Sequence, residues 1–285
     1  MNLHCANRIL DLTAAQVMGV LNTTPDSFSD GGRYLGVAEA VKQADHMLKD
    51  GAAIIDVGGE STRPGAAPVG LQQELDRVIP VIEKISANLD VCISVDTSSP
   101  EVMRAAKQAG AHMLNDVRAL GREGAMKAAA ATGLPVCLMH MQGEPSTMQE
   151  NPLYSQVVND VYGFLGGRIA ACEAAGIEKN RILIDPGFGF GKSLAHNYQI
   201  LNELAHFKEL GVPVLAGLSR KSMIGGALSD GSGNPREVSG RLQGSVAGAL
   251  IAVTNGAKIV RVHDVRETSD ALRIFKATQQ NGLVA

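Results

Sequence analysis

Side chains that could do chemistry occur in this sequence at the ends of short apolar runs. Asp96 closes the run VCISVD, Asp185 is in RILIDP, and Arg261 and His263 are in KIVRVHD. Carboxylates accept hydrogen bonds, whereas an arginine can bind phosphate oxygens through two parallel hydrogen bonds. Together these residue types suit a ligand that combines a donor-rich heterocycle with an anion.

Alternation along each run indicates which side chains share a face. In 91–96 the apolar Ile93 and Val95 belong to one face, so Asp96 points to the other. In 112–117 the rule does not choose between Asn115 and Asp116. Applied to the other runs, with the seventh taken as extended to its end, it gives an inward set: Asn22, Asp56, Asp185, Lys221, Arg261 and His263. Structural ion pairs are the alternative explanation, but buried charges are costly and rarely gather without a function.

Eight runs rich in Val and Ile could hold these residues, and each precedes a segment with helical periodicity. The runs are 16–21, 53–58, 91–96, 112–117, 135–141, 181–186, 213–220 and 258–264. The helical segments are 38–50, 71–86, 100–109, 122–132, 153–175, 196–209, 238–255 and 266–279. Strict alternation implies a parallel sheet, and eight such units predict an α/β protein with a closed (β/α)8 barrel, the TIM barrel. A doubly wound open sheet is the alternative.

The sequence contains no low-complexity linker, so residues 1–285 are predicted to form a single domain in which 1–15 cap the bottom of the barrel. Active sites of such barrels lie at the C-terminal ends of the strands. Two loops there are expected to be long, at about 22–37 and 58–70, where about 2–6 residues are usual. In the first of them Phe28 is the lone aromatic of the stretch 22–32, which predicts a loop that closes over the site.

Composition argues against several other classes of function. The net charge is −3 with both signs scattered along 285 residues, and the chain has no Trp, which argues against nucleic acid as a partner. No stretch of about 18 apolar residues could span a membrane, and the first residues do not have the pattern of a signal peptide. Four cysteines without framework spacing indicate reduced thiols and a cytoplasmic location.

The segment GFGFGKS at 187–193 resembles a phosphate-binding P-loop but is one residue short of its spacing. Its glycines are expected instead to let a loop turn close to a ligand, with Phe188 or Phe190 as a stacking wall. His112 and His140 have the outward parity and are expected to be structural.

Seven motifs, in order along nearly the whole chain, resemble those of the dihydropteroate synthase family of the folate pathway. They are NTTPDSFSDGG (22–32), DVGGESTRPGA (56–66), SVDT (94–97), ND (115–116), DPGFGFGK (185–192), LSRKS (218–222) and RVHDV (261–265). The resemblance implies a transferase that joins 6-hydroxymethyl-7,8-dihydropterin diphosphate to 4-aminobenzoate, giving 7,8-dihydropteroate and diphosphate. It also implies a homodimer and a target of sulfonamides.

The same resemblance implies a set of site residues. The substrate-binding residues would be Thr62, Arg63, Asp96, Asn115, Asp185, Phe190, Ser219, Lys221, Ser222, Arg261 and His263. Of these, Asp96, Lys221 and Arg63 would be catalytic. The pterin would lie on Asp96, Asn115, Asp185 and Lys221, the diphosphate on Arg63, Arg261 and His263, and the 4-aminobenzoate beside Thr62, Lys221 and Ser222. Asn22 would ligate Mg²⁺, which takes its other oxygens from water and phosphate.

The implied reaction begins with loss of diphosphate, in an SN1-like step that leaves a positive charge facing Asp96. Two other functions stay open. A methyltransferase that uses methyltetrahydrofolate would share the pterin residues but lack those for diphosphate and aminobenzoate. A non-catalytic pterin-binding scaffold would have lost members of the set Asn22, Arg63, Lys221 and Arg261, and all four are present.

Overall fold

The computed structural model, which describes residues 1–23, 32–60, 69–144 and 147–279, contains a closed barrel of parallel strands. The strands are β3 (Gln16–Asn22), β4 (Ile54–Gly58), β5 (Cys92–Asp96), β6 (Met113–Asp116), β7 (Val136–Met139), β8 (Ile182–Asp185), β9 (Leu215–Ala216) and β10 (Ile259–Val262). They follow one another in the order β8, β7, β6, β5, β4, β3, β10, β9. A bridge between Ile184 and Val214 closes the ring. The predicted (β/α)8 barrel is confirmed.

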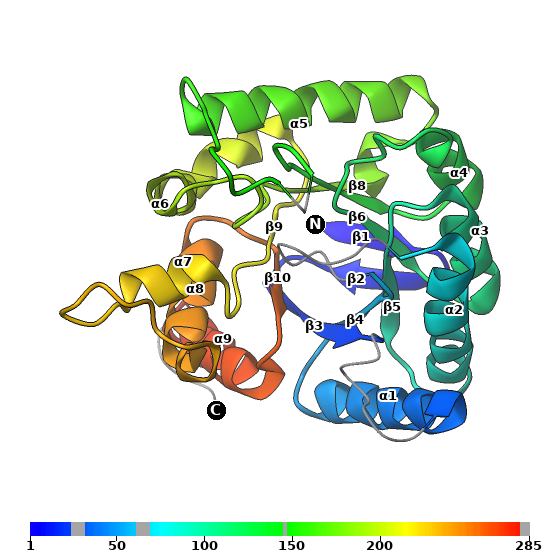
Figure 1. Cartoon of the computed structure of the whole chain (residues 1–285). Coiled ribbons are helices and arrows are strands. Elements are labelled where there is room, and N and C mark those ends of the chain that lie inside the picture. The colour runs from blue at the N-terminus through cyan, green and yellow to red at the C-terminus, as the bar shows by residue number, and fades with distance from the viewer. Residues whose placement is uncertain (24–31, 61–68, 145–146, 280–285) are drawn as a thin grey trace.

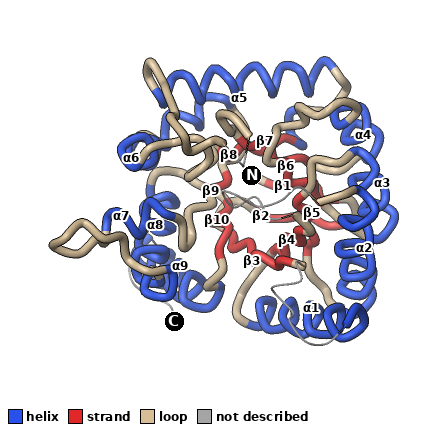
Figure 2. The backbone as a smooth tube through the Cα atoms, in the orientation of Figure 1, coloured by secondary structure: helices blue, strands red, loops and turns tan. Residues whose placement is uncertain are grey.

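Helices form a layer around this ring (Figures 1 and 2). They are α1 (Gly32–Lys49), α2 (Leu71–Asn88), α3 (Pro100–Ala109), α4 (Ala125–Thr132), α5 (Val157–Ala174), α6 (Leu194–Asn202), α7 (Ser222–Ala227), α8 (Leu242–Thr254) and α9 (Val265–Gln279). Helix α2 shows why they dock there, because its buried Val78, Val81, Ile82 and Ile85 recur at helical spacing and share one face.

Side chains of the strands alternate between two apolar cores, as predicted. Ile93 of β5 packs in the outer core between strands and helices, whereas Cys92 packs inside the barrel. Strand β6 settles what the sequence left open. Leu114 belongs to the outer core, so Asn115 faces the interior and Asp116 faces away from it.

Residues 1–15 close the bottom of the barrel, which confirms the predicted cap. Strands β1 (Asn2–Cys5) and β2 (Arg8–Asp11) form an antiparallel hairpin that is seen within the ring in Figure 1. Four hairpin and linker residues pack in the inner core with residues such as Ile54: Leu3, Cys5, Leu10 and Leu12. Arg8 fastens the hairpin through an ion pair with Asp90 (2.6 Å) and a contact with His112 (3.2 Å).

The seventh unit differs from the prediction. The strand expected at 213–220 ends at Ala216, because the chain turns at 218–221 and Arg220 adopts a left-handed backbone with φ 58°. The short helix α7 follows and was not predicted. The helix expected at 238–255 is α8, which begins only at Leu242.

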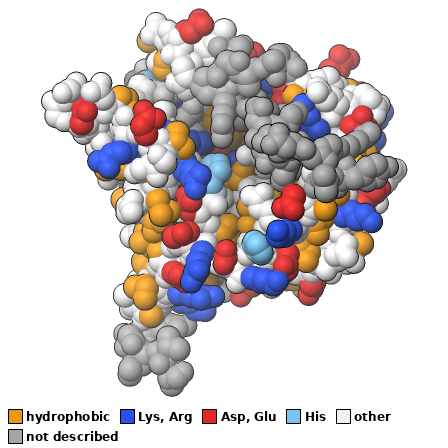
Figure 3. Space-filling view, turned by 60° about the horizontal axis from the view of Figure 1, so that its bottom comes forward, with side chains coloured by type: hydrophobic (Ala, Val, Ile, Leu, Met, Phe, Trp, Pro, Cys, Tyr) orange, Lys and Arg blue, Asp and Glu red, His pale blue; other side chains and the backbone are white. Residues whose placement is uncertain are grey.

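Two further boundaries differ. Helix α1 begins at Gly32, so the first long loop is shorter than the predicted 22–37. The helix expected at 196–209 ends at Asn202 and is followed by a 3-10 helix, Leu204–Leu210. None of the helices in the described part of the chain is long and apolar enough to cross a membrane. On the face shown in Figure 3, acidic and basic side chains are interspersed.

Candidate functional site

Polar residues at the C-terminal end of the barrel meet around Arg261. Its Nε lies 2.6 Å from Oδ2 of Asp56, and its Nη2 lies 2.8 Å from Oδ2 of Asp96. Asn115 donates from Nδ2 to the same Asp56 oxygen over 3.1 Å. The four residues belong to β10, β4, β5 and β6, so the inward parity of four strands brings them together.

Burial and neighbouring charges set the protonation of this group. Burial raises the pKa of Asp96 to about 7, while the charge of Arg261 lowers it and the charge of Asp56 raises it further. Burial alone would lower the pKa of Arg261, but the charges of Asp56 and Asp96 raise it above its ordinary value. Asp96 therefore titrates near neutral pH, whereas the guanidinium stays charged.

Asp185 and Lys221 form another side of the barrel mouth. Asp185 Oδ1 accepts a hydrogen bond from the N–H of Gly187 over 2.7 Å. Lys221 Nζ donates to the carbonyl of Phe188 and lies 4.4 Å from the centre of the Phe190 ring. Burial lowers the pKa of Lys221 to about 8, although the charge of Asp185 raises it. Burial raises the pKa of Asp185, although the charge of Lys221 lowers it.

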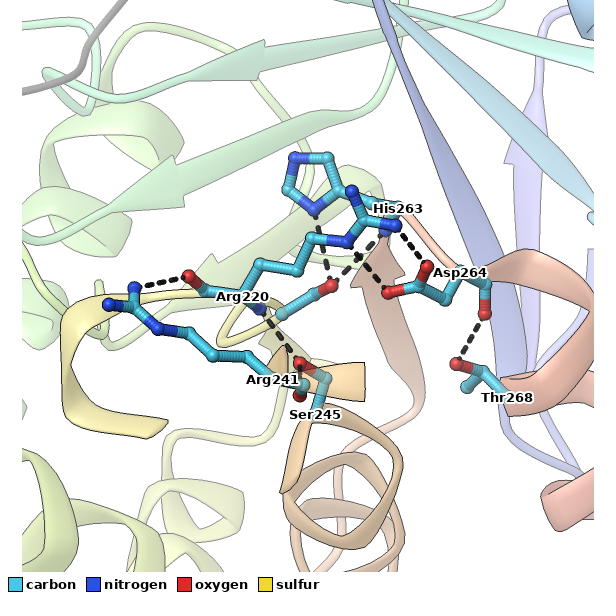
Figure 4. A network of polar contacts seen from close by, with 7 residues as sticks. Arg220, Arg241, Ser245, His263, Asp264 and Thr268 are labelled. Carbon is cyan, nitrogen blue, oxygen red and sulfur yellow. Dashed lines mark hydrogen bonds and ion pairs between the residues drawn. The ribbon is translucent and has the colours of Figure 1, made fainter. Parts of the chain in front are cut away.

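Figure 4 shows how the loops after β9 and β10 are joined. Arg220 makes a two-point ion pair with Asp264, from Nε and Nη2 to the two carboxylate oxygens. Ser219 Oγ accepts from the backbone N–H of His263 over 3.3 Å and lies 3.1 Å from its Nδ1. Arg241 donates to the carbonyl of Arg220. Ser219 and His263, both predicted to bind substrate, are thus in contact.

The remaining predicted site residues fall into two groups. Asn22 is half-buried at the end of β3, and Ser222 is the exposed first residue of α7. Of the two phenylalanines considered as a stacking wall, Phe190 lies beside Lys221, whereas Phe188 is fully buried in the outer core. Three of the positions lie outside the described residues: Phe28, Thr62 and Arg63.

Two apolar residues at the mouth were not predicted as part of the site. Val117 and Met139 pack with Met148 and Phe190 in a small cluster. They also line a cavity of about 460 Å³, together with Arg118 and other residues of the loops after β6 and β7. A signal was available, because Val117 follows β6 directly and Met139 ends β7, at the catalytic end of a barrel.

This arrangement can bind a heterocycle through acceptors and an anion through Arg261. Within the described ranges, no group of three or more His, Cys, Asp or Glu side chains could hold a metal ion. Mg²⁺ fits the remaining donors, because it prefers oxygen ligands and keeps several waters while binding substrate phosphates. The amide oxygen of Asn22 is a donor of that kind.

Comparisons with known proteins agree with this chemistry. Residues 18–263 match the model of a family described as pterin binding enzymes. The dihydropteroate synthase of Escherichia coli strain K12 is 56% identical over 278 residues, which cover 98% of this chain and 96% of that protein. The crystal structure of the Yersinia pestis dihydropteroate synthase with a sulfonamide drug complex has a TM-score of 0.92 and 52% identity, covering 98% of this chain and 100% of that one. The Xanthomonas albilineans dihydropteroate synthase with 4-aminobenzoic acid has a TM-score of 0.91 and 52% identity, covering 98% of both chains.

Proposed function

Because the chain belongs to the pterin-binding enzyme family, among its dihydropteroate synthases, we propose that the barrel mouth joins a pterin diphosphate to 4-aminobenzoate. The product is 7,8-dihydropteroate, so the protein is a transferase that forms a carbon–nitrogen bond. One observation carries the proposal: Asp96 and the buried Asn115 and Asp185 share a mouth with Arg261, in a chain that matches these enzymes along nearly its full length.

We assign the pterin to Asp96, Asn115, Asp185 and Lys221, with Phe190 as its wall. The amino-pyrimidinone edge of a pterin carries N–H donors, and the carboxylates of Asp96 and Asp185 can accept hydrogen bonds from them. The side-chain amide of Asn115 donates a hydrogen bond to Asp56, which leaves its carbonyl oxygen as an acceptor for the pterin.

We assign the diphosphate to Arg261, His263 and Ser219, and to Arg63 by resemblance. Arg261 supplies a permanent positive charge, and the contact between Ser219 and His263 holds that imidazole at the loop after β10. Asn22 would hold Mg²⁺ with phosphate and water oxygens. The chemistry that bound Mg²⁺ supplies is charge neutralisation on those phosphate oxygens.

The reaction breaks the bond between the pterin methylene carbon and a diphosphate oxygen, and both electrons leave with that oxygen. Arg261 stabilises the negative charge as it grows, while the carboxylate of Asp96 faces the positive charge on the pterin. The amine of 4-aminobenzoate, beside Thr62, Lys221 and Ser222, then forms the carbon–nitrogen bond and loses one proton. Asp96 in its ionised form is suited to this role, so activity should weaken below about pH 7.

Incubation of the purified protein with pterin diphosphate, 4-aminobenzoate and Mg²⁺ tests the function. We expect dihydropteroate and diphosphate in equal amounts and no product when either substrate is omitted. Omitting Mg²⁺ and adding a chelator tests the metal separately. Undiminished turnover would contradict the proposal that Mg²⁺ takes part. Methyl transfer from methyltetrahydrofolate, with no dihydropteroate formed, would favour the methyltransferase instead.

We also propose that the protein works as a homodimer in the cytoplasm. The thirteen residues of α8 include no charged side chain, and its Ile251 is 48% exposed, as expected of a surface covered by a second copy. The four cysteines are unpaired and buried, which suits a reducing compartment. Analytical ultracentrifugation tests the dimer, and Ile251→Lys should shift the protein toward the monomer.

A further inference from the structure

Lys192 is a buried cation with no role in the reaction as assigned above. It lies in the loop between β8 and α6, at the end of the segment GFGFGK, and is 3% exposed. Burying an ammonium is costly unless every donor finds an acceptor. The surroundings of its Nζ therefore show what the residue does.

An ammonium has three N–H donors, and Lys192 has a short contact for each of them. Nζ donates to the carbonyl of Gly187 over 2.9 Å and to the carbonyl of Phe190 over 3.0 Å. The third contact is Nδ1 of His140, at 2.9 Å. Because an ammonium cannot accept, Nδ1 must do so, and the imidazole is neutral with its proton on Nε2. Burial, and then the charge of Lys192, lower the pKa of His140 to about 3, in keeping with this form.

The two carbonyls belong to a loop that only glycine-rich sequence could form. Gly187, Gly189 and Gly191 have φ values of 73°, 79° and 59°. A Cβ on Gly187 would lie 1.9 Å from the carbonyl oxygen of His140, so the loop is pressed against the end of β7. This loop shapes the pterin site at two points, since the N–H of Gly187 bonds Asp185 and the Phe190 ring lies under Lys221.

We propose that Lys192 is a positioning residue for pterin binding, which gathers the Gly187 and Phe190 carbonyls around its Nζ and so sets the positions of Asp185 and Phe190. The inference rests on the proposed function. Burial lowers the pKa of Lys192 to about 7, while the charge of Asp185 raises it. A neutral amine would keep two N–H donors for the two carbonyls, and its lone pair could accept from Nδ1 of His140, so all three contacts survive this titration.

The test compares Lys192→Met with Ile85→Ala, a substitution in the outer core near the C-terminal end of α2. That end leads into the start of β5, at the opposite end of the barrel from the mouth, and the substitution destabilises by leaving a cavity. Calorimetry measures pterin affinity without turnover, and steady-state kinetics measures the KM for the aminobenzoate substrate at saturating pterin diphosphate. We expect Lys192→Met to weaken pterin at least about tenfold, as loss of charge-assisted hydrogen bonds would. The KM for aminobenzoate should change less than about threefold, and Ile85→Ala should leave both values unchanged.

A second pair of variants covers the case in which Lys192→Met does not fold. His140→Asn keeps an acceptor near the position of Nδ1. His140→Leu removes that acceptor, and leucine branches at the same carbon as asparagine, so the two variants have a similar shape. We expect His140→Leu to weaken pterin and His140→Asn to restore most of the affinity. Wild-type pterin affinity in folded Lys192→Met, or equal affinities in the His140 pair, would overturn the proposal. Failure of the proposed function would look different, because the wild-type protein itself would then make no dihydropteroate.

Discussion

Asp56 is a residue whose importance lies in its neighbours. One oxygen of its fully buried carboxylate, Oδ2, accepts hydrogen bonds from both Asn115 and Arg261, so Asp56 orients a residue assigned to the pterin together with one assigned to the diphosphate. Its charge also raises the pKa of Asp96, as do the charges of Asp116 and Glu60.

Asp56→Asn should therefore change the pH dependence of pterin binding. An asparagine carbonyl can still accept from both neighbours, so the variant loses charge with little change of shape. With that charge gone, the pKa of Asp96 should fall below about 7. If Asp96 accepts from the pterin, as proposed, we expect pterin binding to weaken as pH falls and Asp96 takes up a proton. In the variant this weakening should begin at a lower pH. Calorimetric titrations from pH 5.5 to 8.5 measure the midpoint, and an unchanged midpoint would contradict the assignment of Asp96.

Arg261→Lys should separate the two halves of the first substrate. Lysine keeps the positive charge that Asp56 and Asp96 require, which alanine would not, but it cannot bind phosphate through two parallel bonds. We expect pterin diphosphate to weaken about tenfold, and free hydroxymethylpterin less than about threefold. Equal losses for both ligands would remove Arg261 from the diphosphate site. Arg273→Lys, on an exposed part of α9, is the control.

Strand alternation predicts which strand residues point into the barrel, but it gives no such rule for residues in loops. Parity placed Asp56, Asp96 and Arg261 inward because a strand alternates regularly. It could not choose between Asn115 and Asp116, because Met113 and Leu114 are both apolar and either could face the helices. In the structure Leu114 does, so Asp116 faces outward with it. Lys192 looked like part of an imperfect P-loop, because a lysine that binds carbonyls of its own loop has no periodic signature.

At the scale of elements, the loops after β9 and β10 act as one unit. The two-point ion pair of Arg220 and Asp264 joins them, and Arg220 holds this position with a left-handed backbone that costs about 1–2 kcal/mol. Lys221 and Ser222 follow directly, beside the proposed place of 4-aminobenzoate. Helix α7 was not predicted here and β9 ends earlier than predicted, because nothing in LSRKS marks the turn at 218–221.

Asp264→Asn should raise the KM for aminobenzoate by about two- to tenfold, since partly exposed ion pairs contribute little individually but this one has two bonds. Pterin affinity should stay near that of the wild type. A double-mutant cycle with Arg220→Ala shows whether the effect comes from the pair. Additive effects would mean that the two residues act separately, and Asp270→Asn on the surface of α9 serves as the control.

At the scale of the whole molecule, the N-terminal hairpin and the barrel share a buried histidine. The N–H of Ile93 donates to Nδ1 of His112 over 3.1 Å, and Nε of Arg8 lies 3.2 Å from its Nε2. Burial, and then the charges of Arg8 and Lys107, lower the pKa of His112 from about 6.5 to about 4. A neutral imidazole can accept a hydrogen bond at only one of its two nitrogens. Protonation would remove that acceptor and place a positive charge beside Arg8, so it would weaken the contacts that hold the hairpin in place.

His112 should make the protein less stable in mild acid. Below pH 6.5 the unfolded chain binds a proton at this histidine, whereas the folded protein does so only below about pH 4. The free energy of unfolding therefore falls as pH decreases from 6.5 to about 4, by at most roughly 3 kcal/mol from this group. His140 contributes in the same direction. Urea unfolding of the wild type and His112→Asn at pH 7.5, 5.5 and 4.5 measures the difference, and an unchanged slope with pH would contradict it.

The ring closes at its weakest point. Strand β9 has two residues, and a single bridge at Ile184 and Val214 joins it to β8, with one backbone bond from Ile184 N to Pro213 O. Strands β4 and β5, by contrast, pair along five residues. Amide protons at this seam should exchange with deuterated water sooner than those of β4, because less structure must open to release them. The part of the barrel that opens most readily is therefore β9, the strand that leads into Lys221. A bound pterin should slow deuterium uptake there more than anywhere else in the barrel.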